Sequence, residues 1–157
     1  MSGIEPFMIQ YFSPGAIIDE RYELNKSLGV GASGEVWLAR DQQIPRNVAL
    51  KIMNGGLTVS DKHVERFHRE IHSLNELGNT HPNIPQLYGA NVLTARPYLV
   101  MEYIAGDSLI NLMNTGKLYK LSFEKRLLTI ISQLSDALTF AHDHNIIHRD
   151  IKPENVK

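Results

Sequence analysis

The fold is decided by the stretch Gly29-Val30-Gly31-Ala32-Ser33-Gly34-Glu35-Val36-Trp37-Leu38. Three glycines in six positions let the backbone approach a ligand closely and point its N–H groups into a concavity that suits phosphate oxygens. A dinucleotide-binding fold needs a helix directly after such glycines, whereas the β-branched and aromatic residues Val36 and Trp37 continue as a strand. The stretch therefore predicts a glycine turn between two strands, with a plain glycine-rich hairpin as the alternative.

Further strands on both sides extend this pair into a sheet. Residues 22–28 alternate before the glycines, and Val48–Met53 form a third predicted strand after a loop at 41–47. Its two faces separate Val48, Leu50 and Ile52 from Ala49, Lys51 and Met53. Lysine is rarely buried unpaired, so Lys51 needs a partner unless its side chain extends to solvent. Ala49, on the same face, is small enough to admit a flat ring.

A helix between Asp61 and Leu77 offers that partner. Its apolar residues recur at helical spacing, as Val64, Phe67, Ile71, Leu74 and Leu77. At about 100° per residue Glu70 lies inside this apolar stripe. A carboxylate there is costly unless it is paired, which predicts an ion pair between Lys51 and Glu70. The alternative is a glutamate at the edge of the stripe that stays in water.

Two histidine pairs offer an alternative metal-binding interpretation, which the local sequence disfavours. His68 and His72 stand four residues apart on the predicted helix, but the zinc-protease pattern needs glutamate directly after the first histidine, where Arg69 stands. His142 and His144 close the last long helix, a position where histidine more often complements the helix dipole than binds metal.

The rest of the chain completes the sheet and then becomes helical. Residues 87–92 and 97–103 are predicted strands that make the sheet five-stranded and antiparallel. The pattern breaks at 104–107. A long helix is expected after Ser122, an N-cap residue with Glu124 in the first turn. Ile146-Ile147 is expected as a short strand. We therefore expect a loosely ordered leader at 1–19, a sheet domain at 20–104 and a helical part at 105–157.

Composition excludes several classes of protein. The 157 residues carry a formal net charge of −1 with a pI near 6.6, so there is no electrostatic footprint for nucleic acid. The absence of cysteine excludes disulfides and thiolate metal sites. No apolar run approaches the ~20 residues of a membrane helix. The N-terminus lacks the features of a secretory signal, so a cytoplasmic location is expected.

The stretch His148-Arg149-Asp150-Ile151-Lys152-Pro153-Glu154-Asn155 gathers the second set of candidate functional side chains. Asp150 is placed as a candidate general base, and Lys152 lies on the same side of an extended segment. Asn155 offers a carbonyl oxygen to a hard cation, and Pro153 stiffens the turn between them. A surface loop with ordinary charges is the alternative for any one of these residues, but it is a poor account of the whole string.

The chain resembles the eukaryotic-type (Hanks-type) serine/threonine protein kinases from Tyr22 to Lys157. The matching motifs, in order, are Gly29–Val36, Val48-Ala49-Leu50-Lys51, Glu70 and His148–Asn155. The resemblance implies an α+β, protein-kinase-like fold. In it, a five-stranded antiparallel N-lobe sheet with one helix precedes the first part of a helical C-lobe. The lead-in at residues 14–24 resembles bacterial kinases of this type.

The resemblance also implies ligands and roles. ATP, magnesium and a protein substrate with serine or threonine are expected partners. The residues implied in covering the phosphates are Gly29, Val30, Gly31, Ala32, Ser33 and Gly34, and those implied around adenine are Leu28, Val36, Ala49, Met101, Glu102 and Tyr103. Glu35 is a further expected nucleotide-binding residue. Lys51 would hold the α- and β-phosphates while paired to Glu70. Asp150 would accept the proton of the substrate hydroxyl, Lys152 marks the serine/threonine class, and Asn155 would bind magnesium.

The tripeptide Asp-Phe-Gly, the second magnesium site of these kinases, does not occur in the chain. The sequence is therefore interpreted as a fragment ending after the catalytic loop, with little phosphoryl-transfer activity of its own and marginal solubility. Two alternatives stay open, a nucleotide-binding pseudokinase or regulatory module and a small-molecule kinase with the same fold. Intact Lys51, Glu70, Asp150 and Asn155 speak against the pseudokinase, because a module released from catalysis has no physical need of all four.

Overall fold

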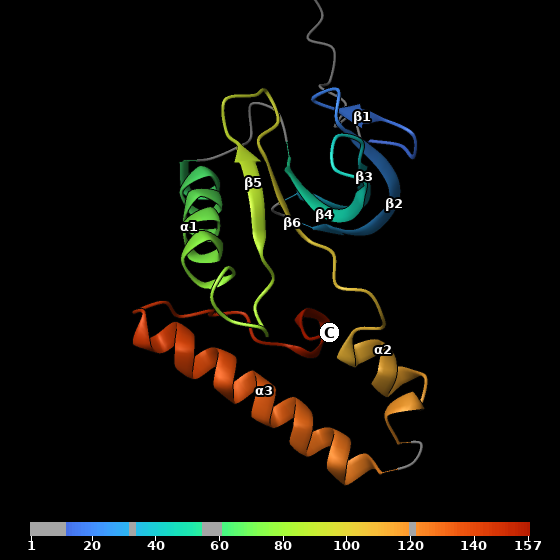
Figure 1. Ribbon diagram of the computed structural model, residues 1–157, viewed down its shortest axis with the longest axis vertical. Helices are drawn as coiled ribbons and strands as arrows, with labels where there is room; N and C mark the ends of the chain where they lie inside the picture. Colours follow the sequence, from blue (N-terminus) through green and yellow to red (C-terminus); the bar gives the residue numbers. More distant parts are fainter. Residues whose placement is uncertain (1–11, 32–33, 55–60, 120–121) are drawn as a thin grey trace, which may run out of the picture. The chain divides into compact units, whose positions relative to one another are not determined.

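The computed structural model describes residues 12–31, 34–54, 61–119 and 122–157. A six-stranded antiparallel sheet has the strand order β1-β2-β3-β4-β6-β5 (Figure 1). The strands are β1 (Ile17–Ile18), β2 (Tyr22–Gly31), β3 (Gly34–Asp41), β4 (Arg46–Met53), β5 (Leu87–Asn91) and β6 (Tyr98–Glu102). The five strands predicted for the sheet all form, and β1 is an additional one.

Strand β1 corrects the prediction of a loosely ordered leader over residues 1–19. Ile17 and Ile18 pair with Glu23 and Tyr22 of β2. Phe12, Ala16 and Ile18 pack against the buried core of the sheet. The prediction is therefore wrong for residues 12–19, while residues 1–11 lie outside the described part of the chain. A strand of two residues is too short to show a period in the sequence.

The turn between β1 and β2 has an uncommon backbone. Asp19 and Glu20 have φ angles of 48° and 53°, left-handed values that suit the two central residues of a tight turn, and the N–H of Arg21 closes this turn on the Ile18 carbonyl at 3.1 Å. Residues other than glycine are strained there, and neighbouring strands hold the turn in place. The Asp19 carboxylate accepts hydrogen bonds from the Tyr98 hydroxyl at 2.5 Å and from the Asn91 amide at 2.8 Å. Burial, together with this bond to Asp19, raises the pKa of Tyr98.

One face of the sheet carries the main hydrophobic core. Val48, Leu50 and Ile52 of β4 are at most 1% exposed and belong to this core. Its other buried members are Tyr22, Leu24, Trp37, Ala39, Tyr98 and Val100. The alternation predicted for β4 is confirmed, because Lys51 lies between these residues in the strand and projects from the other face.

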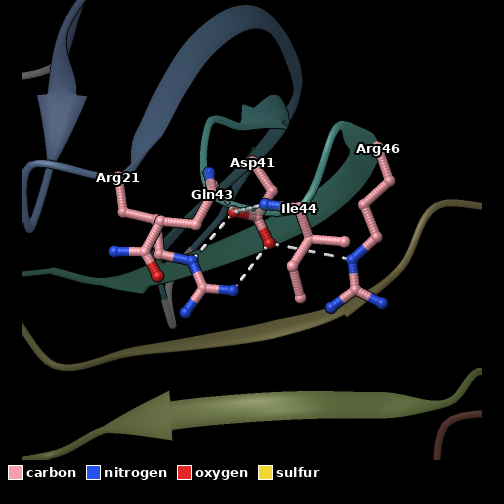
Figure 2. Close-up of polar contacts among 5 residues, drawn as sticks. All are labelled: Arg21, Asp41, Gln43, Ile44 and Arg46. Carbon is pink, nitrogen blue, oxygen red and sulfur yellow. Dashed lines mark hydrogen bonds and ion pairs between the residues drawn. The ribbon is translucent and has the colours of Figure 1, made fainter.

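A buried aspartate organises the end of β3 (Figure 2). The fully buried Asp41 carboxylate accepts hydrogen bonds from Arg21 Nε and Nη2, both at 2.8 Å. The backbone N–H groups of Gln43 and Ile44 donate to its Oδ1 at 3.1 and 3.2 Å and close the turn into β4. Arg46 Nε lies 3.7 Å from Oδ2. The hydrogen bond from Arg21 is the main cause that lowers the pKa of Asp41 from 3.8 to about 2.

The helical elements follow the predicted order. They are α1 (Asp61–Leu77), α2 (Leu109–Asn114), the short 3-10 helix η1 (Lys117–Tyr119), α3 (Phe123–Asp143) and the 3-10 helix η2 (Pro153–Asn155) (Figure 1). The chain divides into two compact units, Met1–His72 with Leu87–Tyr103, and Ser73–Gln86 with Ile104–Lys157. Within the described residues no helix is long and apolar enough to cross a bilayer.

Two local predictions in the second unit need correction. Ser122 precedes α3 as predicted, but its backbone is left-handed, with φ 59°, and its side chain makes no capping hydrogen bond. Ile146-Ile147 does not form a strand. Instead, α3 closes with Asn145 in the left-handed conformation, and the N–H of Ile146 bonds the carbonyl of Ala141 at 2.9 Å. The two isoleucines follow this cap directly and have no partner strand in the described chain.

Candidate active site

An ion pair joins the sheet to α1. Lys51 Nζ lies 2.6 Å from Glu70 Oε1 and 2.5 Å from Oε2, so the ammonium group contacts both carboxylate oxygens. The Lys51 side chain is 17% exposed and that of Glu70 35% exposed. This arrangement confirms the predicted contact. Because Lys51 donates two N–H groups to Glu70 and still reaches solvent, its remaining N–H group can bind an anionic ligand.

The strand register places several predicted adenine-binding residues on the Lys51 face. Directly paired residues of an antiparallel sheet share a face. Val36 of β3 pairs with Lys51, and Ala49 of β4 pairs with Met101 of β6. Ala49 is two residues from Lys51 in the same strand and so lies on its side. Val36, Ala49, Lys51 and Met101 therefore form one continuous surface, opposite the main core.

The glycine stretch borders this surface. Strand β2 continues through Gly31 and β3 begins at Gly34, while Ala32 and Ser33 lie outside the described residues. A Cβ added at Gly29 or Gly31 would meet no atom within 4 Å, so the space above both is open. Gly34 differs: it has φ 142°, and a Cβ there would lie 2.0 Å from the Ile52 carbonyl oxygen. Only glycine allows β3 to start this close to β4.

The first unit also contains the remaining residues predicted around the nucleotide. Leu28 and Val30 of β2 are exposed large hydrophobic side chains. Glu102 ends β6 and Tyr103 follows it, and both are half-buried. Glu35 departs from a simple ligand-binding role because its side chain is 1% exposed. Its carboxylate accepts hydrogen bonds from Trp37 and Arg96 instead, so its side chain does not face a ligand.

The second unit holds the predicted catalytic loop. Lys152 Nζ lies 3.0 Å from Asp150 Oδ2. Asn155 Nδ2 donates to the same oxygen at 3.1 Å and to the Asp150 carbonyl at 2.9 Å. The hydrogen bond from Lys152 is the main cause that lowers the pKa of Asp150. The structure therefore brings together the three side chains that the sequence singled out in this stretch.

Backbone geometry shapes the same loop. Arg149 has φ 63°, an uncommon left-handed value for a long side chain. The N–H of Asp150 donates to His148 Nδ1 at 3.3 Å. Residues Pro153–Asn155 form η2, which brings Asn155 back toward Asp150. The Asn155 amide nitrogen is thus engaged with Asp150, while the amide oxygen, the atom of this side chain that can bind a cation, takes no part in these two bonds.

Among the described residues no three His, Asp or Glu side chains group as metal ligands. His144 Nδ1 instead donates to the carbonyl of Phe140 at 2.8 Å, as expected for histidine at a helix C-terminus.

Two polar groups of the first unit were missed by sequence reasoning. They are the Arg21–Asp41–Arg46 cluster and the Glu35–Arg96 pair, whose members lie 61 positions apart.

Comparisons with known proteins agree with these features. The family model described as "Protein kinase domain" matches residues 22–156. The chain is 37% identical over 144 residues to CBL-interacting serine/threonine-protein kinase 12 of Arabidopsis thaliana, covering 92% of this chain and 28% of that protein. It is also 37% identical over 144 residues to serine/threonine-protein kinase PknB of Mycolicibacterium smegmatis, covering 88% of this chain and 22% of that protein.

Solved structures show the same fold. The crystal structure of the Mycobacterium tuberculosis PknI kinase domain has a TM-score of 0.73 and 26% sequence identity, covering 92% of this chain and 56% of that one. The predicted kinase-like fold is confirmed, with six strands in place of five. The chain spans between 21% and 28% of the length of the first curated relatives it matches. By its match to the family model over residues 22–156, this chain belongs to the protein kinase domain family.

Proposed function

We propose that this chain serves the transfer of the γ-phosphoryl group of ATP to a serine or threonine hydroxyl of a protein substrate. The observation that carries the proposal is the Lys51–Glu70 ion pair, on the face of the sheet that the glycine stretch borders. In protein kinases this pair must be in place before the phosphates are held for reaction. We assign residues 20–104 to the ATP-binding lobe and residues 105–157 to the helical lobe that carries the catalytic loop.

The residues present fit ATP. The open space above Gly29 and Gly31 leaves room for phosphate oxygens beside backbone N–H groups. The apolar surface of Val36, Ala49 and Met101 suits a flat base, with Leu28 and Val30 exposed on β2 beside it. Lys51 provides the positive charge for the α- and β-phosphates. In this proposal the backbone of Glu102 and Tyr103 meets the adenine edge.

The catalytic loop supplies the proton acceptor. Asp150 would accept the proton of the substrate hydroxyl while the hydroxyl oxygen forms a bond to the γ-phosphorus. The bond from that phosphorus to the bridging oxygen breaks, and ADP leaves. Lys152, 3.0 Å from Asp150, would offset negative charge on the transferred group. The amide oxygen of Asn155 is suited to Mg²⁺, a hard cation that would neutralise phosphate charge when bound.

Nucleotide binding tests the first half of the proposal. Titration calorimetry with a non-hydrolysable ATP analogue and Mg²⁺ should show saturable binding to the wild-type chain. We expect Lys51→Ala to weaken it by about tenfold or more, since a charge-assisted contact to phosphate is worth about 1.5–3 kcal/mol. The exposed Lys62 of α1 provides a matched control, and Lys62→Ala should bind as wild type does. Equal binding by the wild type and Lys51→Ala would overturn this part.

Phosphoryl transfer tests the second half. Radiolabelled phosphate should pass from ATP to a serine- and threonine-rich protein such as casein only at a low rate, as expected of a chain without the tripeptide Asp-Phe-Gly. Asp150→Asn should stop this transfer without weakening ATP binding. Binding without transfer by the wild-type protein would favour a regulatory, pseudokinase-like module. Transfer only to small-molecule hydroxyls would favour a small-molecule kinase of the same fold.

A further inference from the structure

We propose that Arg96 is a positioning residue for the glycine stretch, and that it acts through the buried carboxylate of Glu35. The inference rests on the proposed function, because it assigns Arg96 to the phosphate side of ATP binding. It concerns the opposite face of the sheet from Lys51. Glu35 pairs with Ile52 in the strand register and so lies on the core face, where a direct contact with a nucleotide is excluded.

The Glu35 carboxylate is enclosed and satisfied by two side-chain donors. It is 1% exposed, Trp37 Nε1 donates to its Oε2 at 3.0 Å, and Arg96 Nη2 donates to its Oε1 at 2.8 Å. A buried carboxylate is stable only when it is paired and hydrogen-bonded. Trp37 supplies a neutral donor from the same strand, whereas Arg96 supplies the charge. Arg96 is therefore what allows a carboxylate to stay at this position.

Arg96 itself is held on further sides. Its Nε donates to the carbonyl of Met53 at 3.3 Å, and its guanidinium lies over the ring of Phe12, 4.2 Å from the centroid. Its side chain is 20% exposed. Arg96 thus links β3, through Glu35, to the end of β4, through Met53. A planar guanidinium suits this task because its donors have a fixed relative geometry.

Glu35 and Met53, the two residues that Arg96 links, lie where the chain leaves the glycine stretch and enters β3. Gly34 pairs with Met53, and Glu35 pairs with Ile52. The close approach of Gly34 to the Ile52 carbonyl leaves no slack at this point. The other end of the stretch is tied as well, since Asn54 Nδ2 donates to the Gly31 carbonyl at 3.3 Å. Asn54 and Arg96, which lie outside β2 and β3, therefore hold the two ends of the stretch proposed to cover phosphate.

Removing Arg96 would leave Glu35 as an uncompensated buried charge. The carboxylate would then lose its charged partner, and we expect the start of β3 to move away from β4 as the carboxylate turns toward water. This movement would shift the backbone N–H groups of the glycine stretch relative to Lys51. Phosphate contacts should suffer, whereas contacts to the adenine ring by Val36 and Ala49 should largely persist.

The experiment compares two ligands that differ only in phosphate. Calorimetry should show that Arg96→Ala lowers the affinity for a non-hydrolysable ATP analogue about tenfold, but lowers the affinity for adenosine less than about twofold. Arg96→Lys, which retains the charge, should lie between the wild type and Arg96→Ala. Adding Glu35→Gln to Arg96→Ala should recover at least about a threefold part of the loss, because it removes the unpaired charge. The exposed Arg40 of β3 gives a matched control in Arg40→Ala.

Amide hydrogen exchange without nucleotide separates this inference from the proposed function. Exchange at Gly34, Glu35 and Val36 should be faster in Arg96→Ala than in the wild type. Unchanged exchange, an equal loss of affinity for both ligands, or no recovery in the double variant would each overturn the positioning role. If the wild type binds no ATP while exchange still rises in Arg96→Ala, the proposed function is wrong. The role of Arg96 in nucleotide binding is then wrong as well, and Arg96 only stabilises the structure.

Discussion

Asp41 and Asp150 both have a lowered pKa and a basic partner within about 3 Å, yet their surroundings differ. Asp41 is fully buried, and both its oxygens accept hydrogen bonds from the chain. Asp150 is 62% exposed, and within its unit the contacts from Lys152 and Asn155 both fall on Oδ2. A buried carboxylate whose two oxygens are both bonded to the chain can only hold structure. One with an open oxygen can still accept a proton from a substrate.

The largest effect should come from breaking the buried member of this comparison. We expect Asp41→Ala to lower the free energy of unfolding by about 3–5 kcal/mol, because it leaves Arg21 and Arg46 without their shared partner. Asp150→Ala should leave it essentially unchanged, as expected for an exposed residue. Urea unfolding followed by the fluorescence of the single tryptophan measures both. Similar losses in the two variants would remove the distinction between a structural and a catalytic aspartate.

The complementary effect concerns catalysis. Asp150→Asn should reduce phosphoryl transfer at least about 100-fold, because a positioned general base typically contributes that much. Asp41→Asn should retain most of the wild-type rate per molecule that still binds ATP. Initial rates normalised to the concentration of ATP sites make this test independent of stability. A larger loss of rate per site in Asp41→Asn than in Asp150→Asn would contradict it.

A third effect is the dependence of stability on pH. Folding lowers the pKa of Asp41 from 3.8 to about 2, so its contribution is present above pH 4 and is lost as the pH falls toward 2. The difference corresponds to about 2 kcal/mol of unfolding free energy. Between pH 5 and pH 2 the free energy of unfolding of the wild type should therefore fall by this amount more than that of Asp41→Asn. Parallel curves would show that another carboxylate dominates acid unfolding.

The smallest effect tests whether the more distant arginine matters. Arg46 Nε lies 3.7 Å from Asp41, and its guanidinium lies over the ring of Tyr88, 3.5 Å from the centroid. Arg46→Ala should lower the free energy of unfolding by about 1 kcal/mol, the order of a partly desolvated cation–π contact. Arg40→Ala, an exposed arginine of β3, should have almost none of this effect. Equal effects would mean that Arg46 contributes only as a surface charge.

The parts of the fold and site that were predictable are those with a local signature. Lys51 was identifiable because a lysine interrupts an apolar strand, and Glu70 because it interrupts an apolar helical stripe. A charged side chain within an apolar face implies a partner of opposite charge, and Lys51 and Glu70 are each other's partner. The stretch around Asp150 was identifiable because an acid, two cations and an amide fall within eight positions.

The parts that were missed depend on contacts distant in sequence. Glu35 looks like an ordinary polar residue after a glycine, and only the fold brings Arg96 to it across 61 positions. Strand β1 has too few residues to show a period, and its turn is held by Tyr98 and Asn91 from the opposite end of the sheet. Ser122 has the right identity for a cap but a left-handed backbone that removes the capping bond.

Strand β1 also covers part of one edge of the sheet. A sheet edge with unpaired N–H and C=O groups is a template for another chain, and natural proteins commonly cover such edges. Ile17 and Ile18 occupy part of the β2 edge, at Glu23 and Tyr22, and the residues just before them bond to Leu24. A version of the chain begun at Tyr22, where the family match starts, would uncover that edge together with the apolar surface beneath Phe12 and Ala16. Such a shortened chain would be prone to pair with its own copies, edge to edge.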